Sequence, residues 1–549
     1  MYNRIKILIL FTLVSVLSSC EEEFLDTSPT DAVTPTVALQ DVENMKKVLN
    51  GIHRTLYSQS QTVFPGGNTS RANDHYWVPL GDNLAGGLIH SADANNLGWR
   101  TEMQWNSHTV PTSLTNEILW YHRYNIILHA NFILERIGRG DLPVTPELKE
   151  VEGQAYTYRA FAYLSLVQHY AKGYLIGNPS TDKGVPINLI PETTGPRKTV
   201  EEVYVQIGKD LDAAIAAFGG ATSRPSGDPK LKSQLNINVA HGIKARWALS
   251  KGDWATAATS AIAARQGFPI MGKADWLSGF NTNNLPEVIW GSNVIGTETT
   301  FFRSYFYLAS NTFNGSQIRS NPKIADRRLV DAIPNTDYRK EVFIIDAPNT
   351  NSSASNGQGG VSGGQPRDPR YAGNLAGYNA KRAEINSKYG ISNSFNQHPY
   401  MHFKLKNANP GSIDPDDIIY MRSSEMYLIE AEAKTMLNDL PGARAALNPL
   451  GSARDSNYNV NQYTTQSSLM AHIKFQRGVE LWGEGFGYTD KIRWDEEIDH
   501  EANGGSGASQ VLYQAAWKVA KPSINNDWIF KIPQKEIDAN PDIGPGDQN

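Results

Sequence analysis

The hydrophobic and polar positions of this chain alternate most regularly at 420–433, with the period of an α-helix. At that period one face carries small, aromatic and aliphatic side chains: Tyr420, Ser424, Tyr427, Leu428, Ala431 and Thr435. Glu430 and Lys434 point away from this face. The pattern predicts an amphipathic helix that packs on its apolar side.

Three charged residues, Arg422, Glu425 and Glu432, lie beside the apolar face of this predicted helix rather than opposite it. Three charges in one strip could mark a site. On a packed helix, however, such a strip more often pairs with a neighbouring helix or caps its end. We therefore interpret the segment as scaffold, and we expect Arg422→Ala to lower stability while the folded fraction keeps its ligand affinity.

Helical periodicity also recurs along much of the remaining chain. Thr199, with Glu202 three residues later, has the spacing of a capping box and predicts a helix that starts there and runs to about 218. Further helices are predicted at 37–57, 114–137, 147–171, 236–251, 253–266 and 467–482.

Two of these helical segments resemble each other. Residues 245–258 and 433–443 both contain an alanine-bearing helix and a short polar turn with Asp253 or Asp439, followed four residues later by Ala257 or Ala443. This is weak helix–turn–helix repetition, close to tetratricopeptide spacing. The expected fold class is therefore mainly α, a tetratricopeptide-like scaffold of three or four helix pairs with an irregular, loop-rich subdomain that carries the ligand site.

The stretches 58–113 and 275–420 interrupt the helical pattern and read as irregular. Within the second, the Asn, Ser and Gly tract 348–364 is predicted to be a mobile surface loop. The expected organisation is a signal peptide at 1–19, a lipidated tether at 20–41, an N-terminal helical part at 42–274, a loop-rich subdomain at 275–420 and a C-terminal helical part at 421–549. We expect the two helical parts to pack as one globular unit.

The chain begins like an exported protein. Arg4 and Lys6 precede an apolar run at 7–16, too short to span a membrane, and then Leu17-Ser18-Ser19-Cys20. This ending resembles a bacterial lipobox, which implies cleavage before Cys20 and lipidation of that residue; the alternative is an ordinary signal peptide that leaves an unpaired cysteine. Cys20 is the only cysteine, so neither a disulfide framework nor a thiolate metal site is expected.

Composition narrows the function. A net charge of -5 and a pI near 6.2, without a basic stripe, argue against nucleic-acid binding. The 12 Trp and 24 Tyr exceed what a plain helical scaffold needs, and Asn and Gly accompany them in the loops. Sugar-binding proteins use this mixture, because aromatic rings stack on pyranose faces while amides and carboxylates bind hydroxyl groups.

Short motifs spread over nearly the whole chain resemble the SusD/RagB family of outer-membrane nutrient-binding lipoproteins. They are the lipobox with Phe24-Leu-Asp26, Tyr158-Arg-Ala-Phe161, Asp368-Pro-Arg370, the 420–433 segment, Arg477 with Glu480-Leu481, Glu484-Gly485, Asp490, Arg493-Trp494, Phe530-Lys-Ile-Pro533, Glu536-Ile537 and Asn540-Pro541. Where the family has a Glu-Arg pair and a later Arg, this chain has Gln476-Arg477 and Gly487, so we expect a thinner ion-pair network there.

The resemblance implies a protein of the outer membrane, held by a lipid anchor and facing the cell exterior. Glu21, Glu22 and Glu23, directly after the lipobox, resemble an export signal for that face. It further implies oligosaccharide capture and delivery to a SusC-like TonB-dependent transporter, without catalysis and without a cofactor. A peptide ligand for the same kind of transporter is the first alternative, and a glycoside hydrolase, which needs two suitably spaced carboxylates, is a weaker one.

The ligand site is expected on two aromatic-rich loop regions rather than on the stacked helices. Trp99 is the leading stacking candidate and Trp77 the next. The full candidate set is Asp74, Tyr76, Trp77, Asn83, Asn96, Trp99, Arg100, Trp105, Trp276, Phe301, Tyr305 and Tyr307. By contrast, Trp120, Trp247 and Trp254 sit at helical positions flanked by small residues and are predicted to pack in the core.

Other catalytic and metal patterns are weak. Residues 360–364 match the nucleophile-elbow motif but fall in the Asn, Ser and Gly tract. Residues 267–273 approach a phosphate-binding loop, but Ala274 follows where that motif has a residue with a hydroxyl group. His398 and His402 are separated by Pro399, which disfavours the helix that would bring both to one metal, so both are predicted to be core or surface histidines. Calcium is possible, but no ligand-spaced motif supports it.

Overall fold

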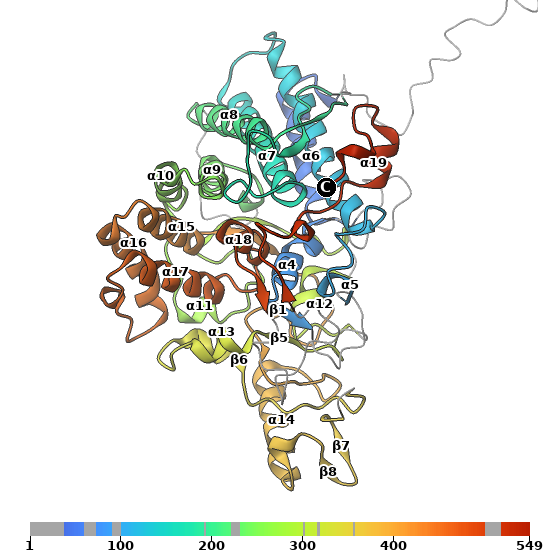
Figure 1. The fold of residues 1–549 in the computed structure, drawn as a ribbon, viewed down its shortest axis with the longest axis vertical. Helices are drawn as coiled ribbons and strands as arrows, with labels where there is room; N and C mark the ends of the chain where they lie inside the picture. Colours follow the sequence, from blue (N-terminus) through green and yellow to red (C-terminus); the bar gives the residue numbers. More distant parts are fainter. Residues whose placement is uncertain are drawn as a thin grey trace, which may run out of the picture.

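The computed structural model describes residues 38–59, 73–90, 100–191, 194–220, 231–299, 302–315, 319–354, 357–499 and 518–549. Helices dominate this part of the chain, as expected for the mainly α fold class (Figure 1). Of the helices in these ranges, none is both long and apolar enough to cross a membrane. The predicted signal peptide and Cys20 lie outside the described residues.

The N-terminal helices form one layer, drawn in blue to green in Figure 1. Consecutive members pack on one another from α6 to α10, and Thr199 caps α8 through the predicted capping box. The predicted helices are confirmed to within a few residues at most ends. They are α3 (Val42–Thr55), α6 (Leu114–Gly138), α7 (Pro146–Tyr170), α8 (Val200–Phe218), α9 (Ile237–Lys251) and α10 (Trp254–Ala264).

The two similar segments form matching helical hairpins, α9 with α10 and α15 (Ser423–Met436) with α16 (Leu440–Arg454). Each turn has a left-handed residue, Gly252 (φ 79°) or Asn438 (φ 61°), followed by an aspartate that caps the next helix. Asp253 accepts from the amide of Thr256 and Asp439 from that of Gly442. Helix α10 packs on α15, so the two hairpins join the N-terminal and C-terminal helices.

The predicted helix at 420–433 is wrong at its first turn. Residues Ile418–Arg422 form strand β10, which pairs antiparallel with β4 (Val288–Ser292), and α15 begins only at Ser423. Pairing with β4 outweighs the helical pattern because it satisfies the backbone of a fully buried segment. Glu430, predicted to point away from the packed face, is buried and forms ion pairs with Arg265 and Lys434.

The stretches predicted to be irregular contain short regular elements. Helix α4 (Asp74–Leu84) lies in 58–113; it carries Pro79 and Gly81, which weaken helical propensity, so packing rather than local sequence forms it. A four-stranded sheet of order β1-β5-β9-β6 joins both stretches. Its strands are β1 (Leu88–His90), β5 (Lys323–Ala325), β9 (Met401–His402) and β6 (Phe343–Ile344).

The remaining elements are short, apart from α14 and α17. The helices are α5 (Arg100–Met103), α11 (Lys273–Trp276), α12 (Tyr305–Ala309), α13 (Arg327–Ala332), α14 (Leu375–Tyr389), α17 (Gln466–Glu480), α18 (Gly487–Trp494) and α19 (Gln534–Ala539). The strand pairs are β2 (Lys183–Pro186) with β3 (Arg197–Thr199), β7 (Val361–Ser362) with β8 (Gln365–Pro366), and β11 (Ile498–Asp499) with β12 (Lys518–Val519).

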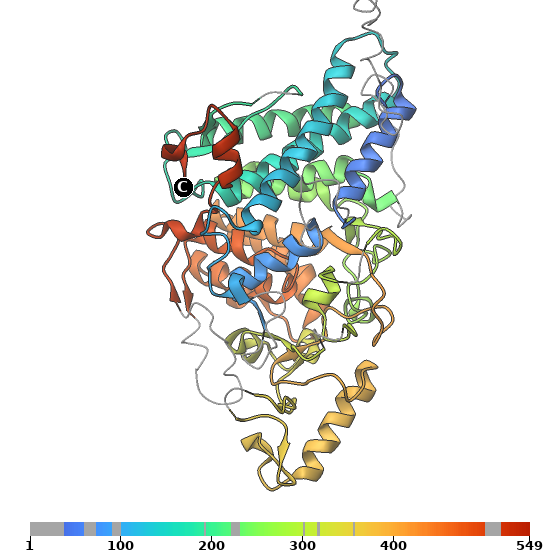
Figure 2. The ribbon, with the colours of Figure 1, turned by 90° about the vertical axis from the view of Figure 1, so that its right-hand side faces the viewer.

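The tract 348–364 is not the free surface loop that its composition predicts. The backbone amide of Asn349 donates to Asp368 (3.0 Å), Thr350 accepts from the amide of Gln397 (2.8 Å), and both Asn349 and Thr350 are buried. The tract leads into β7, β8 and α14, which form an arm that projects from the body (Figures 1 and 2). Polar side chains thus pack here by hydrogen bonding, which composition alone does not reveal.

A buried cluster of charges, which we call the ionic seam, lies where β10, α16 and α17 meet. It comprises Glu287, Asp337, Arg339, Lys404, Arg422, Arg454, Glu480 and Glu484. Their side chains are at most 5% exposed, and four carboxylates face four cations. Each charge is thereby compensated without water.

The arginines of the seam bind several carboxylates at once. Arg422 donates to Glu287 (2.7 Å), Glu480 (2.8 Å) and Glu484 (2.7 Å). Burial alone would raise the pKa of Glu480, but Arg454, Arg422 and Arg339 hold that pKa well below its usual range. Gln476 stands where the family has a glutamate and still joins the seam, because its side-chain oxygen accepts from Arg339 (2.7 Å).

Candidate functional site

The structure brings the two aromatic-rich regions of the sequence together. Helix α12 packs on α4, and the backbone amide of Tyr305 donates to Nδ1 of His75 (3.0 Å). The side chain of Gln59 donates to the carbonyl of Phe302 (2.8 Å) and accepts from Thr299 (2.9 Å). We call this region, formed by 57–59, 73–76, 298–299 and 302–307, the loop face; its residues are buried except Glu298, Thr299, Phe302 and Arg303, which are partly exposed.

An aromatic and cationic pair lies at the edge of the loop face. Phe302 and Arg303 are both partly exposed, and the guanidinium of Arg303 lies 5.2 Å from the ring centre of Phe302. The ring of Tyr307 lies 5.4 Å behind Phe302. The Tyr307 hydroxyl is buried and has no hydrogen-bond partner among the described residues. The pair offers a ring for stacking and donors for hydroxyl or carbonyl oxygens.

Unusual backbone conformations occur at the same place. Asn73 has φ 90° and Arg303 has φ 59°, values that cost free energy for residues with a side chain. Asn73 is buried, and its side chain accepts from the amide of His75 at the start of α4. Neutral His75, whose pKa burial lowers to about 3, in turn holds α12 through Tyr305. The local fold is therefore constrained around the exposed pair.

Most of the candidates that fall in the described residues are buried rather than exposed on loops. Tyr76, Trp105, Trp276 and Tyr305 donate to Glu102, Leu84, Glu480 and Gly483 respectively, so their polar atoms are used within the core. The buried candidates are Asp74, Tyr76, Trp77, Asn83, Trp105, Trp276, Tyr305 and Tyr307. They do not gather at one place: Tyr305 lies at the loop face, whereas Trp276 packs against Tyr338 and Trp105 against Trp528.

The remaining candidates are not placed. Asn96, Trp99 and Phe301 lie outside the described residues, and so does the side chain of Arg100, whose backbone begins α5. The residues predicted to pack in the core do so: Trp120 and Trp247 are buried, and Trp254 is partly buried against the core. His398 and His402 are also buried. Phe302 and Arg303 belong to the second aromatic-rich region that the sequence predicts, whereas nothing in the sequence pointed to Gln59.

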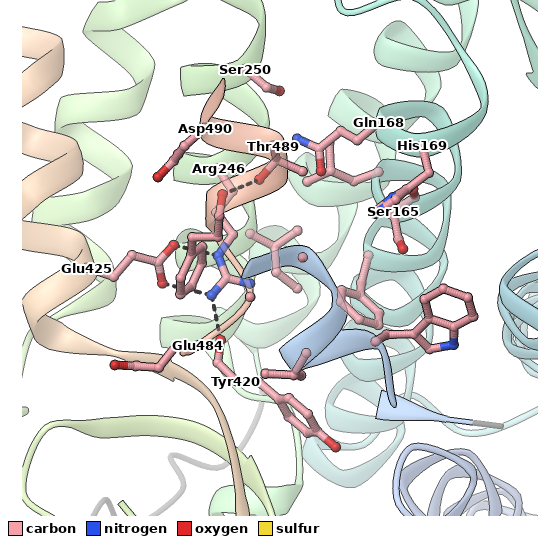
Figure 3. A pocket seen from close by; sticks show the side chains of 18 of the residues that line it. Ser165, Gln168, His169, Arg246, Ser250, Tyr420, Glu425, Glu484, Thr489 and Asp490 are labelled. Atoms are coloured by element: carbon pink, nitrogen blue, oxygen red, sulfur yellow. Dashed lines mark hydrogen bonds and ion pairs between the residues drawn. The ribbon is translucent and has the colours of Figure 1, made fainter. Parts of the chain in front are cut away.

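A second candidate lies between the N-terminal and C-terminal helices. This inner crevice, of about 170 Å³, is lined by α4, α6, α7, α9, α15 and α18 (Figure 3), and the candidates Asp74 and Trp77 belong to its lining. Arg246 occupies its centre, donates twice to Glu425 (2.7 Å each) and lies 5.1 Å from the ring centre of Phe486. Ser165, Gln168 and Thr489 add hydroxyl and amide groups to its walls. Its volume is below the range of roughly 300–1,000 Å³ that is typical of ligand sites.

Metal chemistry has little support in the described part of the chain. No group of three or more His, Cys, Asp or Glu side chains there is arranged to hold a metal ion. The buried carboxylates of the ionic seam are neutralised by arginine and lysine. A cation would have to compete with these internal partners.

Comparisons with known proteins agree with the architecture. A model described as "SusD family" matches residues 281–549, and a second, described as "Starch-binding associating with outer membrane", matches 23–226. The SusD-like protein P38 of Formosa agariphila is 23% identical over 525 residues, which cover 90% of this chain and 92% of that protein.

Solved structures show the same fold. A SusD-like carbohydrate binding protein from Bacteroides vulgatus is similar with a TM-score of 0.71 and 22% identity, covering 92% of this chain and 97% of that one. A SusD superfamily protein from Bacteroides thetaiotaomicron gives 0.67 and 20%, covering 92% and 99%. The two family models leave only a short stretch between them unmatched, and the chain belongs to the SusD/RagB family.

Proposed function

We propose that this protein is a cell-surface lipoprotein that captures oligosaccharides at the loop face. The observation that carries the proposal is the convergence of 57–59, 73–76, 298–299 and 302–307 around the partly exposed Phe302 and Arg303. Family membership supports it, since one matching model is described as starch-binding and a structural relative as carbohydrate binding.

The chemistry of the loop face suits a neutral sugar. The ring of Phe302 can cover the apolar face of a pyranose, and the partly exposed guanidinium of Arg303 can donate to its hydroxyls, while the buried Gln59 holds the backbone of Phe302 in place. Because Asn73 and His75 constrain the backbone, little conformational entropy would be lost on binding. The ligand would be held without being cleaved.

We further propose that Cys20 is lipidated and that the protein delivers its ligand to a SusC-like TonB-dependent transporter. The lipobox-like Leu17-Ser18-Ser19-Cys20 and the outer-membrane description of the family model support this. Cys20→Ala should release the protein from the membrane fraction. Co-purification of a TonB-dependent transporter from the native outer membrane would test the partnership, and the absence of such a transporter from the purified material would contradict it.

Isothermal titration calorimetry tests the glycan-binding proposal. The probes are maltohexaose, cellohexaose, xylohexaose and mannohexaose, with an oligopeptide mixture as the competing class. Binding of at least one glycan by the wild-type protein, weakened by Arg303→Ala, is the expected result. Binding of peptides only would contradict it, and new reducing ends after incubation with polysaccharides would contradict the non-catalytic role.

A further inference from the structure

A larger cleft lies on the other side of α18 from the inner crevice. This outer cleft encloses about 780 Å³, compared with 170 Å³ for the inner crevice. Its walls come from α13, α17, α18 and the segment that leads into β11, and the loop after α4 closes one end. Its volume falls within the range of roughly 300–1,000 Å³ that is typical of ligand sites.

The floor of the outer cleft is apolar and open. Phe475 and Leu329 are partly buried in the hydrophobic core, so each shows part of its surface to the cleft. Gly478 on α17 has no side chain to fill the space, and a Cβ there would reach 3.3 Å from Leu329. Ala332, at the end of α13, is exposed. An aromatic ring beside aliphatic carbon gives a surface on which a flat, partly apolar ring can lie.

The rim of the outer cleft carries charges of both signs. Lys474 pairs with Glu496 (2.7 Å), Arg328 with Asp326 (2.7 Å) and Lys521 with Asp495 (3.3 Å). All six side chains are 15–49% exposed. Such pairs present acceptors and donors together, which matches hydroxyl groups because each hydroxyl both donates and accepts.

The charge balance argues against an anionic ligand. The lining holds seven carboxylates and five cationic side chains: Asp82, Asp326, Asp490, Asp495, Glu496, Glu497 and Asp499 against Arg328, Lys474, Arg477, Lys491 and Lys521. A polyanion would meet net repulsion, while a neutral ligand would not.

We propose that the outer cleft is a second oligosaccharide-binding site, distinct from the loop face, that takes a neutral sugar chain. This proposal rests on the proposed glycan-binding function. The two sites lie at opposite ends of α4, with Asn73 and His75 at the loop face and Asp82 at the cleft. At 1.5 Å per residue, the 11 residues of α4 separate them by roughly 16 Å, so a single protein can hold two parts of one long glycan.

The test compares a blocked cleft with a matched surface change. Ala332→Trp places a bulky ring at an exposed position on the cleft wall, and Phe475→Ala removes the ring of the floor. Ala376→Trp on α14, at an equally exposed alanine of the projecting arm, is the control. Circular dichroism melts confirm that each variant is folded.

Calorimetry with maltohexaose, cellohexaose, xylohexaose and mannohexaose is run in an Arg303→Ala background, so that binding at the loop face is weakened. We expect residual binding that Ala332→Trp abolishes, that Phe475→Ala weakens by about tenfold and that Ala376→Trp leaves unchanged. Residual binding that is the same in folded Ala332→Trp overturns the second site. If no glycan binds even the wild-type protein, the proposed function fails together with it.

Discussion

The ionic seam and the loop face both pack against α4 and its neighbours, yet they use polar side chains in opposite ways. In the seam, Arg422, Glu480 and the other charges are at most 5% exposed and meet partners within the protein. On the loop face, Phe302 and Arg303 are partly exposed, and the hydroxyl of Tyr307 has no partner in the described residues. The dense cluster of charges is therefore part of the scaffold, whereas the partly exposed aromatic residue and the Tyr307 hydroxyl without a partner in the described part of the chain belong to the candidate site.

The seam is balanced as a unit rather than pair by pair. Burial of one charge costs several kcal/mol, and this cost is offset only if all neighbours remain. Removal of one arginine of the seam therefore leaves its buried carboxylate partners without a compensating charge. Removal of an exposed arginine instead leaves its carboxylate partner in contact with water. The comparison can be tested by changing each region separately.

The largest effect is expected from Arg422→Ala. It leaves Glu287, Glu480 and Glu484 facing fewer cations in a dry interior, so the free energy of unfolding should fall by about 3–5 kcal/mol. Urea denaturation measures this change. The exposed Arg328→Ala, which breaks a surface pair with Asp326, is the control and should change stability by about 1 kcal/mol or less.

Glycan affinity of folded Arg422→Ala should equal that of the wild-type protein, because Arg422 is buried in the seam. A large loss of affinity at an unchanged melting temperature would show that the seam is itself the binding site. Equal destabilisation by Arg422→Ala and Arg328→Ala would show that burial does not distinguish the two ion pairs.

A smaller loss of stability is expected from Gly81→Ala, because the added methyl group would push α4 away from the loop that carries Glu484. A Cβ at position 81 would lie 2.4 Å from the carbonyl oxygen of Gly485, a backbone atom that cannot easily move. Overpacking of this kind costs about 1–3 kcal/mol. Gly51→Ala in α3 meets no atom within 4 Å and should instead stabilise by about 0.5–1 kcal/mol. Thermal melts of both variants check the opposite signs.

The dependence of stability on pH should have two components of opposite sign. Arginine and lysine partners lower the pKa of Glu480 and Glu484 in the folded state despite burial. The stability that they contribute is complete above the unfolded pKa of about 4.3 and is lost as pH falls through the folded values. Acid should therefore unfold the seam.

Asp82 contributes the opposite component. Burial raises its pKa to about 6, although its two oxygens accept the amides of Gly485 (2.7 Å) and Gly487 (2.9 Å). The folded state then binds this proton more tightly than the unfolded state, so stability should decline modestly as pH rises from about 4 to 6. Asp82→Asn should flatten this decline in urea titrations at pH 5 and pH 7. An unchanged slope would contradict the assignment.

The sequence predicted the long helices outside 275–420 well because they carry their own signals, but it missed α14 within that stretch. Thr199 and Glu202 cap α8, and Asp253 and Asp439 cap the second helices of both hairpins, through local contacts that spacing alone reveals. Strand β10 was misread as helix, since its pairing with β4 joins residues more than 120 positions apart. Helix α4 was read as loop because its stability comes from packing.

The candidate site was predictable in region but not in residue. The aromatic-rich stretches around Trp77 and Tyr305 do come together, as expected for one site. Composition does not reveal, however, how deeply each side chain is buried. Trp77, Trp105 and Trp276 belong to the same aromatic-rich stretches as Phe302, yet they are buried and Phe302 is partly exposed. The expected thinning of the ion pairs is offset at Gln476, since an amide oxygen accepts from Arg339 without charge.

Paired measurements of glycan affinity and melting temperature on Arg303→Ala test the central claim most directly. Arg303 is partly exposed on the loop face, so its removal should lower affinity by about tenfold and change the free energy of unfolding by no more than about 0.5 kcal/mol. Unchanged affinity in the folded variant, for a glycan that the wild-type protein binds, would contradict the assignment of the loop face as the binding site.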